Sequence, residues 1–278
     1  RVAALLALAG ALGWGVGDFL GGLATRRLAV LTVLAVSQAV GLVGVLAWAI
    51  LSGDALPGVT ELLPAAGAGI AAMVGLAALY RGFAIGAMGI VAPISAAAPI
   101  VPLIVDASRG DVPGALQWLG VALVLMGIAV LSREPRAGGQ RVVAAGAGLA
   151  VVAALGFGLF FVGIDAGSDE SAAWAVTAAR SASVPLVILA ALITSTALRP
   201  PRAMLPILVG VGVFDTLSNV SVVAATTYGA VGIVAVLSSL YPVVTVVLAW
   251  IVLRERLSAV KRVGGAVALA GAALVAAG

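Results

Sequence analysis

Three ionisable residues interrupt long apolar segments of this sequence, namely Asp18, Arg180 and Asp215. Inside a bilayer a charged side chain is costly, and it generally faces a wet cavity or an oppositely charged partner. Each of the three therefore has two possible roles. It could bind a substrate charge or a proton, or it could form a structural ion pair that locks helices together.

Asp215 has the most regular polar surroundings. Ser218 and Asn219 follow it at three and four residues, so on a helix the three side chains share one face. An apolar helix with one polar stripe should turn that stripe toward a cavity. We therefore expect Asp215 and Asn219 to bind substrate or a coupling ion, with Asp215 exchanging a proton or pairing with a substrate amine.

Arg180 carries a planar guanidinium that can hold a carboxylate through two parallel hydrogen bonds. This would suit an amino acid or another organic acid. The alternative is a salt bridge with Asp215 or Asp165. Gln38 lies next to the position that corresponds to Arg180 in the internal repeat described below, so both halves are expected to place polar groups at a similar depth.

Asp18 follows Trp14 by one helical turn, and Arg81 ends the third apolar segment on the same expected side of the membrane. This predicts a gating or structural pair between Asp18 and Arg81. Aromatic and hydroxyl side chains are further candidates for lining a binding cavity. These candidates are Trp14, Tyr80, Ser95, Phe161, Ser238 and Tyr241. Trp14 and Tyr80 could equally be interfacial or core residues.

Several kinds of chemistry are excluded by composition. The sequence has no histidine and no cysteine, which removes Ser–His and Cys–His catalysis, ordinary zinc sites and disulfides. It has no Walker motif. We therefore expect no catalytic residues, no bound metal and no cofactor. Basic residues lie in short gaps between apolar runs rather than in a stripe with aromatics, so no nucleic-acid partner is expected.

The elements that position these residues are expected to be transmembrane helices. Hydrophobic residues make up 63% of the chain and charged residues 9%, against about 25% charged in a soluble domain. A spanning helix needs about 20 apolar residues, and ten segments qualify. They are Val2–Leu23, Ala29–Leu51, Leu62–Tyr80, Ala84–Val105, Pro113–Leu131, Val142–Ile164, Ala172–Leu198, Ala203–Ala225, Ala230–Val252 and Ser258–Ala277.

The two halves of the chain resemble each other at an offset of 143 residues. Gly89, Ser95 and Pro99 of the first half align with Gly232, Ser238 and Pro242 of the second. The repeats are residues 1–132 and 142–278, joined by the linker 133–141. Five helices are an odd number, so the second repeat must enter the membrane from the opposite face. The sequence thus predicts an all-α membrane protein, with two inverted five-helix repeats around a central cavity.

Charge in the gaps predicts the orientation. Twelve basic residues follow odd-numbered segments, and only Arg1 and Arg109 lie on the other side. The positive-inside rule then places the basic face in the cytoplasm and both termini outside.

Three phrases carry a resemblance to a known family: Trp14–Gly22, Val91–Ser95 and Leu240–Thr245, with the charged turn Leu253–Leu257 after the ninth segment. With them the whole chain resembles the EamA-like family of the drug/metabolite transporter superfamily. The resemblance implies ten helices around a cavity, with the fifth and tenth at the periphery. It also implies export or exchange of amino acids and other small metabolites. The family's Gly-Glu-Arg turn reads Arg254-Glu255-Arg256 here.

We therefore predict a secondary transporter that exports amino acids or other small organic metabolites by alternating access, with proton coupling as one energy source. A passive channel and an intramembrane enzyme based on aspartates are the alternatives. The expected partners are a small-molecule substrate and the lipid bilayer. The chain is expected to be a monomer, with a dimer as the alternative, in the bacterial inner membrane.

Overall fold

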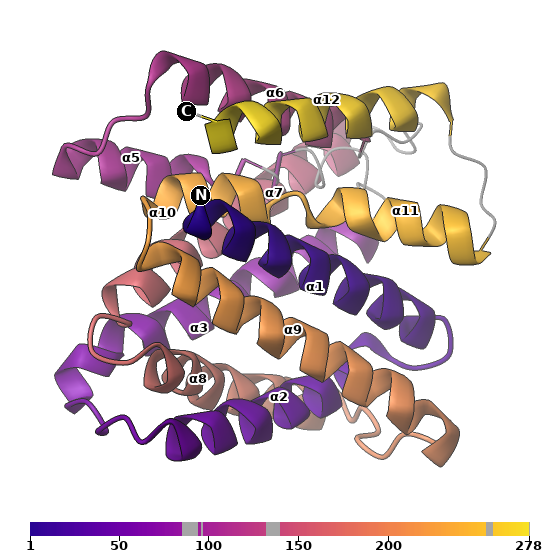
Figure 1. Ribbon diagram of the computed structural model, residues 1–278. Coiled ribbons are helices and arrows are strands. Elements are labelled where there is room, and N and C mark those ends of the chain that lie inside the picture. The colour runs from indigo at the N-terminus through magenta and orange to yellow at the C-terminus, as the bar shows by residue number, and fades with distance from the viewer. Residues whose placement is uncertain (85–93, 96, 132–139, 254–257, 278) are drawn as a thin grey trace.

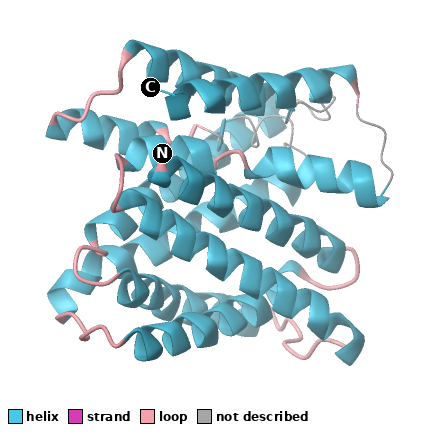
Figure 2. Cartoon of the chain, viewed as in Figure 1, coloured by secondary structure: helices cyan, strands magenta, loops and turns pink. Residues whose placement is uncertain are grey.

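The computed structural model describes residues 1–84, 94–95, 97–131, 140–253 and 258–277. In these ranges the chain is helical, with short connecting loops and no strand (Figure 2). The helices are α1 (Val2–Thr25), α2 (Val30–Ser52), α3 (Val59–Ala84), α5 (Ile100–Arg109), α6 (Ala115–Leu131), α7 (Gln140–Ala166), α8 (Ala172–Ile193), α9 (Leu205–Thr226), α10 (Val231–Ser238), α11 (Tyr241–Leu253) and α12 (Ala259–Ala277), with the 3-10 turn η1 (Arg202–Met204) before α9.

The helices form a multi-pass membrane bundle. Eight stretches of the described ranges are long and apolar enough to cross a bilayer, and α10 with α11 make one of them. Large apolar side chains cover the outside, such as Val43, Leu51 and Ile193, which are 70%, 84% and 75% exposed. A soluble protein seldom shows large apolar patches to water, so this surface fits lipid. Figure 1 shows the helices running side by side, with both termini toward the same end.

Local signals explain several helix ends. Gly53 and Gly110 follow α2 and α5 with φ of 75° and 96°, the left-handed conformation that glycine adopts without strain. The predicted helix to Leu198 ends five residues earlier, at Ile193. There Ser195 takes a φ of 51°, and the Thr196 amide donates to the Ala191 carbonyl at 2.8 Å. This closing turn stops α8 despite the apolar sequence that follows.

The ninth predicted segment is broken rather than continuous. It divides into α10 and α11 around Ser239 and Leu240, because Pro242 cannot donate a backbone hydrogen bond. The Leu240 amide donates to Leu237, and the Val243 amide to Leu240. The fourth predicted segment, Ala84–Val105, lies partly outside the described residues. Its described part contains a turn at 97–99 and then α5, which continues to Arg109.

The same hydrogen bonds occur at both breaks. In the first half the Ala97 amide donates to Ile94 and the Ile100 amide to Ala97. These are the bonds described above for Leu240 and Val243, shifted by 143 residues. Each spans three residues rather than four, so each break is a short stretch of 3-10 turn. The repeat seen in the sequence therefore extends to backbone geometry.

Close contacts between the halves also occur in pairs at this offset. A Cβ added at Gly15 of α1 would lie 2.4 Å from Cβ of Val244 in α11. A Cβ added at Gly158 of α7 would lie 2.5 Å from Cβ of Val101 in α5. Gly158 and Val244 follow Gly15 and Val101 by 143 residues. The second contact is thus the first with the halves exchanged.

The last helices of the two halves, α6 and α12, pack directly on each other. A Cβ at Gly120 would lie 2.7 Å from the carbonyl oxygen of Gly271, and a Cβ at Gly127 would lie 2.7 Å from that of Gly264. The earlier residue of α6 meets the later residue of α12, so the two helices are antiparallel. Small residues permit this close approach. The pair lies at the edge of the bundle (Figure 1).

Candidate functional site

A cavity of about 890 Å³ lies between the two halves. This volume suits a metabolite-sized ligand, since ligand pockets usually measure roughly 300–1,000 Å³. Most of its lining is apolar, and its polar residues come from both halves. They are Asp18, Thr25, Ser37, Gln38 and Ser95 from the first half and Arg180, Ser183, Asp215, Asn219, Ser239, Tyr241 and Thr245 from the second.

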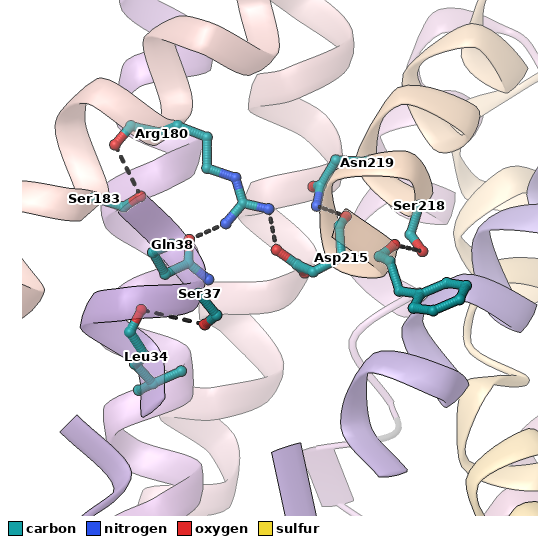
Figure 3. Close-up of polar contacts among 9 residues, drawn as sticks. Leu34, Ser37, Gln38, Arg180, Ser183, Asp215, Ser218 and Asn219 are labelled. Atoms are coloured by element: carbon teal, nitrogen blue, oxygen red, sulfur yellow. Dashed lines mark hydrogen bonds and ion pairs between the residues drawn. The ribbon is translucent and has the colours of Figure 1, made fainter. Parts of the chain in front are cut away.

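A polar network joins α2, α8 and α9 at one wall of the cavity (Figure 3). The guanidinium of Arg180 donates to Oε1 of Gln38 and to Oδ2 of Asp215. Arg180 is only 7% exposed. Of the two partners left open by the sequence, the structure therefore joins Arg180 to Asp215. Asp165 instead accepts from Arg109 at 3.4 Å. The network brings together three predicted site residues.

Small residues make room for the buried guanidinium. A Cβ added at Gly41 of α2 would lie 3.8 Å from Cζ of Arg180 and 2.6 Å from Oγ1 of Thr216. The amide of Asn219 donates to the backbone carbonyl of Asp215 at 2.7 Å rather than to its carboxylate. The hydroxyl of Ser218 likewise bonds within α9, to the Phe214 carbonyl. The polar stripe of α9 is thus real, with Asp215 as the member that reaches another helix.

Asp18 lines the same cavity from α1 and is exposed there. Arg81, at the end of α3, is also exposed. Between these two described side chains the structure forms no ion pair. The predicted gating pair is therefore not made in this conformation.

An aromatic cluster lies at the inner end of the cavity. The Trp14 ring contacts Phe161 and Tyr241 edge to face, with centroids 6.1 and 6.3 Å apart. Phe161 also contacts Phe160 at 5.6 Å. Trp14, Phe161 and Tyr241 were all expected to line the cavity, and the structure brings them together. The side chain of Tyr80 lies outside the described part of the chain.

The two predicted serines differ in position. Ser95 lines the cavity, whereas Ser238 is fully buried and donates to the Ala7 carbonyl at 3.4 Å. Its neighbour Ser239 lines the cavity instead. The expectation for Ser238 assumed a continuous helix, and the break after α10 changes which residue faces inward. Thr245 was missed, although its position one helical turn after Tyr241 places both on one face.

The cavity reaches only one end of the bundle. On α1 it is lined from Trp14 to Thr25 and on α2 from Val30 to Gln38, so it extends toward the basic loop with Arg26 and Arg27.

At the other end, polar contacts join the helix ends. Asp106 of α5 accepts from the Gly232 amide in the first turn of α10 at 2.6 Å, and the hydroxyl of Ser171 donates to Asp54 at 2.6 Å. The Arg109–Asp165 ion pair lies at this end as well. The bundle is thus bridged at the end away from the basic loop.

These features define the class of the molecule as an all-helical membrane protein with a solute-sized polar cavity between two similar halves. The chain belongs to the EamA-like transporter family, whose model matches residues 1–133 and 144–277. Members of this family are membrane transporters of small solutes. Among solved structures, the chain is similar to one titled "Crystal structure of protein", with a TM-score of 0.83 and 18% identity over 98% of this chain and 95% of that one. That likeness concerns the fold. No curated protein matches the chain.

Proposed function

We propose that this chain is a secondary carrier that exports amino acids or other small organic metabolites by alternating access. One observation carries the proposal: charged and polar groups from both halves meet in a single cavity, with Asp18 and Gln38 from the first and Arg180 and Asp215 from the second. A site between two repeats is the arrangement that secondary transporters use.

The contacts between the halves support an inverted repeat of ten spans. The paired contacts of Gly15 and Gly158 exchange the halves, as a two-fold relation requires. Because the equivalent helices α6 and α12 run antiparallel, the axis of that relation lies across the helices, in the plane of the membrane. Two halves related in this way can exchange their packing, so that the cavity reaches first one side and then the other.

The basic face is proposed to lie in the cytoplasm of a bacterial inner membrane, with both termini outside. The cavity then reaches the cytoplasm in this structure, which is the state that loads an export substrate. The native chain has no cysteine, so single-cysteine variants can test the orientation. An impermeant maleimide should label Ser52→Cys, but not Arg27→Cys, in intact cells. The opposite result would reverse the orientation.

Transport itself is tested by counterflow in proteoliposomes. Vesicles preloaded with a mixture of amino acids and amines should take up a labelled member faster than empty vesicles, because a loaded carrier returns more readily. A passive channel gives no such trans-stimulation, and its absence would contradict the carrier.

Proton coupling is proposed to use a cavity carboxylate, either Asp215 or Asp18. A pH gradient should therefore drive uptake in the wild type and fail in at least one of the variants Asp215→Asn and Asp18→Asn. Unchanged pH-driven transport in both variants would remove the coupling role of these residues.

A further inference from the structure

The charges that line the cavity do not balance. In the described ranges, its ionisable lining residues besides Tyr241 are Asp18, Arg180 and Asp215. Asp215 is joined to Arg180 by an ion pair, so these two charges compensate each other. The carboxylate of Asp18 has no such partner among the side chains that the structure describes. An unpaired charge inside a membrane protein is costly, so a ligand that supplies the opposite charge would be favoured.

Arg180 is poorly placed to attract an anion of its own. Its guanidinium already donates to Gln38 and Asp215, and the residue is 7% exposed. A carboxylate ligand would have to displace Asp215 from the guanidinium and would also meet the negative charge of Asp18. The electrostatics of the cavity therefore oppose anions.

The surroundings of Asp18 are open and aromatic. Gly21 and Gly22 line the cavity beside it, and a Cβ added at either would touch nothing within 4 Å. Trp14 lies one turn earlier on the same helix face, in edge contact with Tyr241. Aromatic ring faces attract organic cations, most strongly when the cation is removed from water. The carboxylate and the rings thus recognise different parts of one molecule.

We propose that the cavity binds an organic cation, a small amine with an aromatic or apolar body, and that Asp18 is its counter-ion. This inference rests on the proposed function and narrows its range of metabolites to those without a free carboxylate. The ammonium binds at Asp18, the apolar body lies against the cluster of Trp14 and Tyr241, and the Arg180–Asp215 pair remains intact.

Three probes that share one body and differ in charge test the proposal. They are 2-phenylethylamine, 2-phenylethanol and 3-phenylpropionate, titrated into the purified full chain in detergent by calorimetry. The amine should bind at least about 10-fold more tightly than the propionate, a difference of about 1.4 kcal/mol. Asp18→Asn should lower the affinity for the amine by about 10-fold or more, whereas Asp18→Glu should keep the preference. The matched control is Asp169→Asn, which removes an exposed carboxylate from a loop and should keep it too.

The proposal is overturned if the amine does not bind, if the propionate binds equally well, or if Asp18→Asn leaves the affinity for the amine unchanged. Should Asp18→Asn fail to fold, the preference of the wild-type chain among the three probes still decides the matter. Counterflow separates this inference from the carrier. Amine binding without trans-stimulation would contradict the carrier alone, and trans-stimulation by the propionate as strong as by the amine would contradict the cation site alone.

Discussion

Breaking the ion pair between Arg180 and Asp215 should destabilise the bundle more than the loss of any surface charge. Two charges roughly 4 Å apart attract each other by about 4 kcal/mol at an effective dielectric constant of about 20. Removing one partner of a buried pair typically costs about 3–5 kcal/mol, because the other charge stays buried without compensation. The side chain of Asp215 is 26% exposed, against 8% for Arg180. Water in the cavity can therefore partly solvate the remaining carboxylate, and we expect Arg180→Met to cost about 2–4 kcal/mol.

The assay is reversible unfolding in mixed detergent micelles, followed by tryptophan fluorescence. A double-mutant cycle isolates the pair. Asp215→Leu alone should also destabilise, because it leaves the guanidinium buried, whereas the double variant Arg180→Met/Asp215→Leu should recover at least half of the summed loss. The matched control Arg262→Met removes an exposed basic residue and should change little. If the two single losses simply add, the pair does not stabilise the fold and the reasoning from burial is wrong.

Three further predictions follow from contacts already described. Gly15→Ala should destabilise or prevent folding, because its Cβ would lie 2.4 Å from another side chain, whereas Gly148→Ala, with nothing within 4 Å, should unfold like the wild type; equal stability of both variants would contradict the packing. Asp106→Ala should cost about 1–3 kcal/mol, because it leaves a buried amide of α10 without an acceptor, and an unchanged unfolding free energy would show that the bond is not needed. Arg109→Ala should cost less than about 1 kcal/mol in the same assay, because its side chain is 50% exposed; a larger loss would mean that water screens this pair poorly.

The sequence was most informative about the elements, because long apolar runs leave a bilayer as their only suitable surroundings. It was less informative where local geometry competes with composition. Nothing in the apolar stretch after Ile193 indicated that Ser195 would adopt a left-handed φ and end α8. Pro242 did indicate a bend, but the sequence did not give the extent of the 3-10 turn around Ser239. For that reason Ser238 was expected in the cavity that Ser239 lines.

The site was predictable as a set of residues but not as a set of pairs. Rarity of charge in apolar segments was enough to select Asp18, Arg180 and Asp215, and the structure places all three on one cavity. Which carboxylate pairs with Arg180 depends on how α8 and α9 are rotated and packed, and spacing along the chain does not determine that. The partner chosen for Asp18, Arg81, was a guess from shared depth that ignored their lateral separation in the bundle.

The hydrogen bond from Gly232 to Asp106 has a counterpart in neither sequence nor composition of the other half. The positions that correspond to Asp106 are Ala249 and Trp250, and neither side chain can accept a hydrogen bond from a helix amide. If the halves exchange their packing, the bond formed in this conformation has no equivalent in the other.

A difference of about 1–2 kcal/mol corresponds to a five- to thirty-fold preference. The molecule would therefore idle with its vestibule facing the arginine-rich side, and cargo or an ion gradient would have to supply the bias for the return stroke.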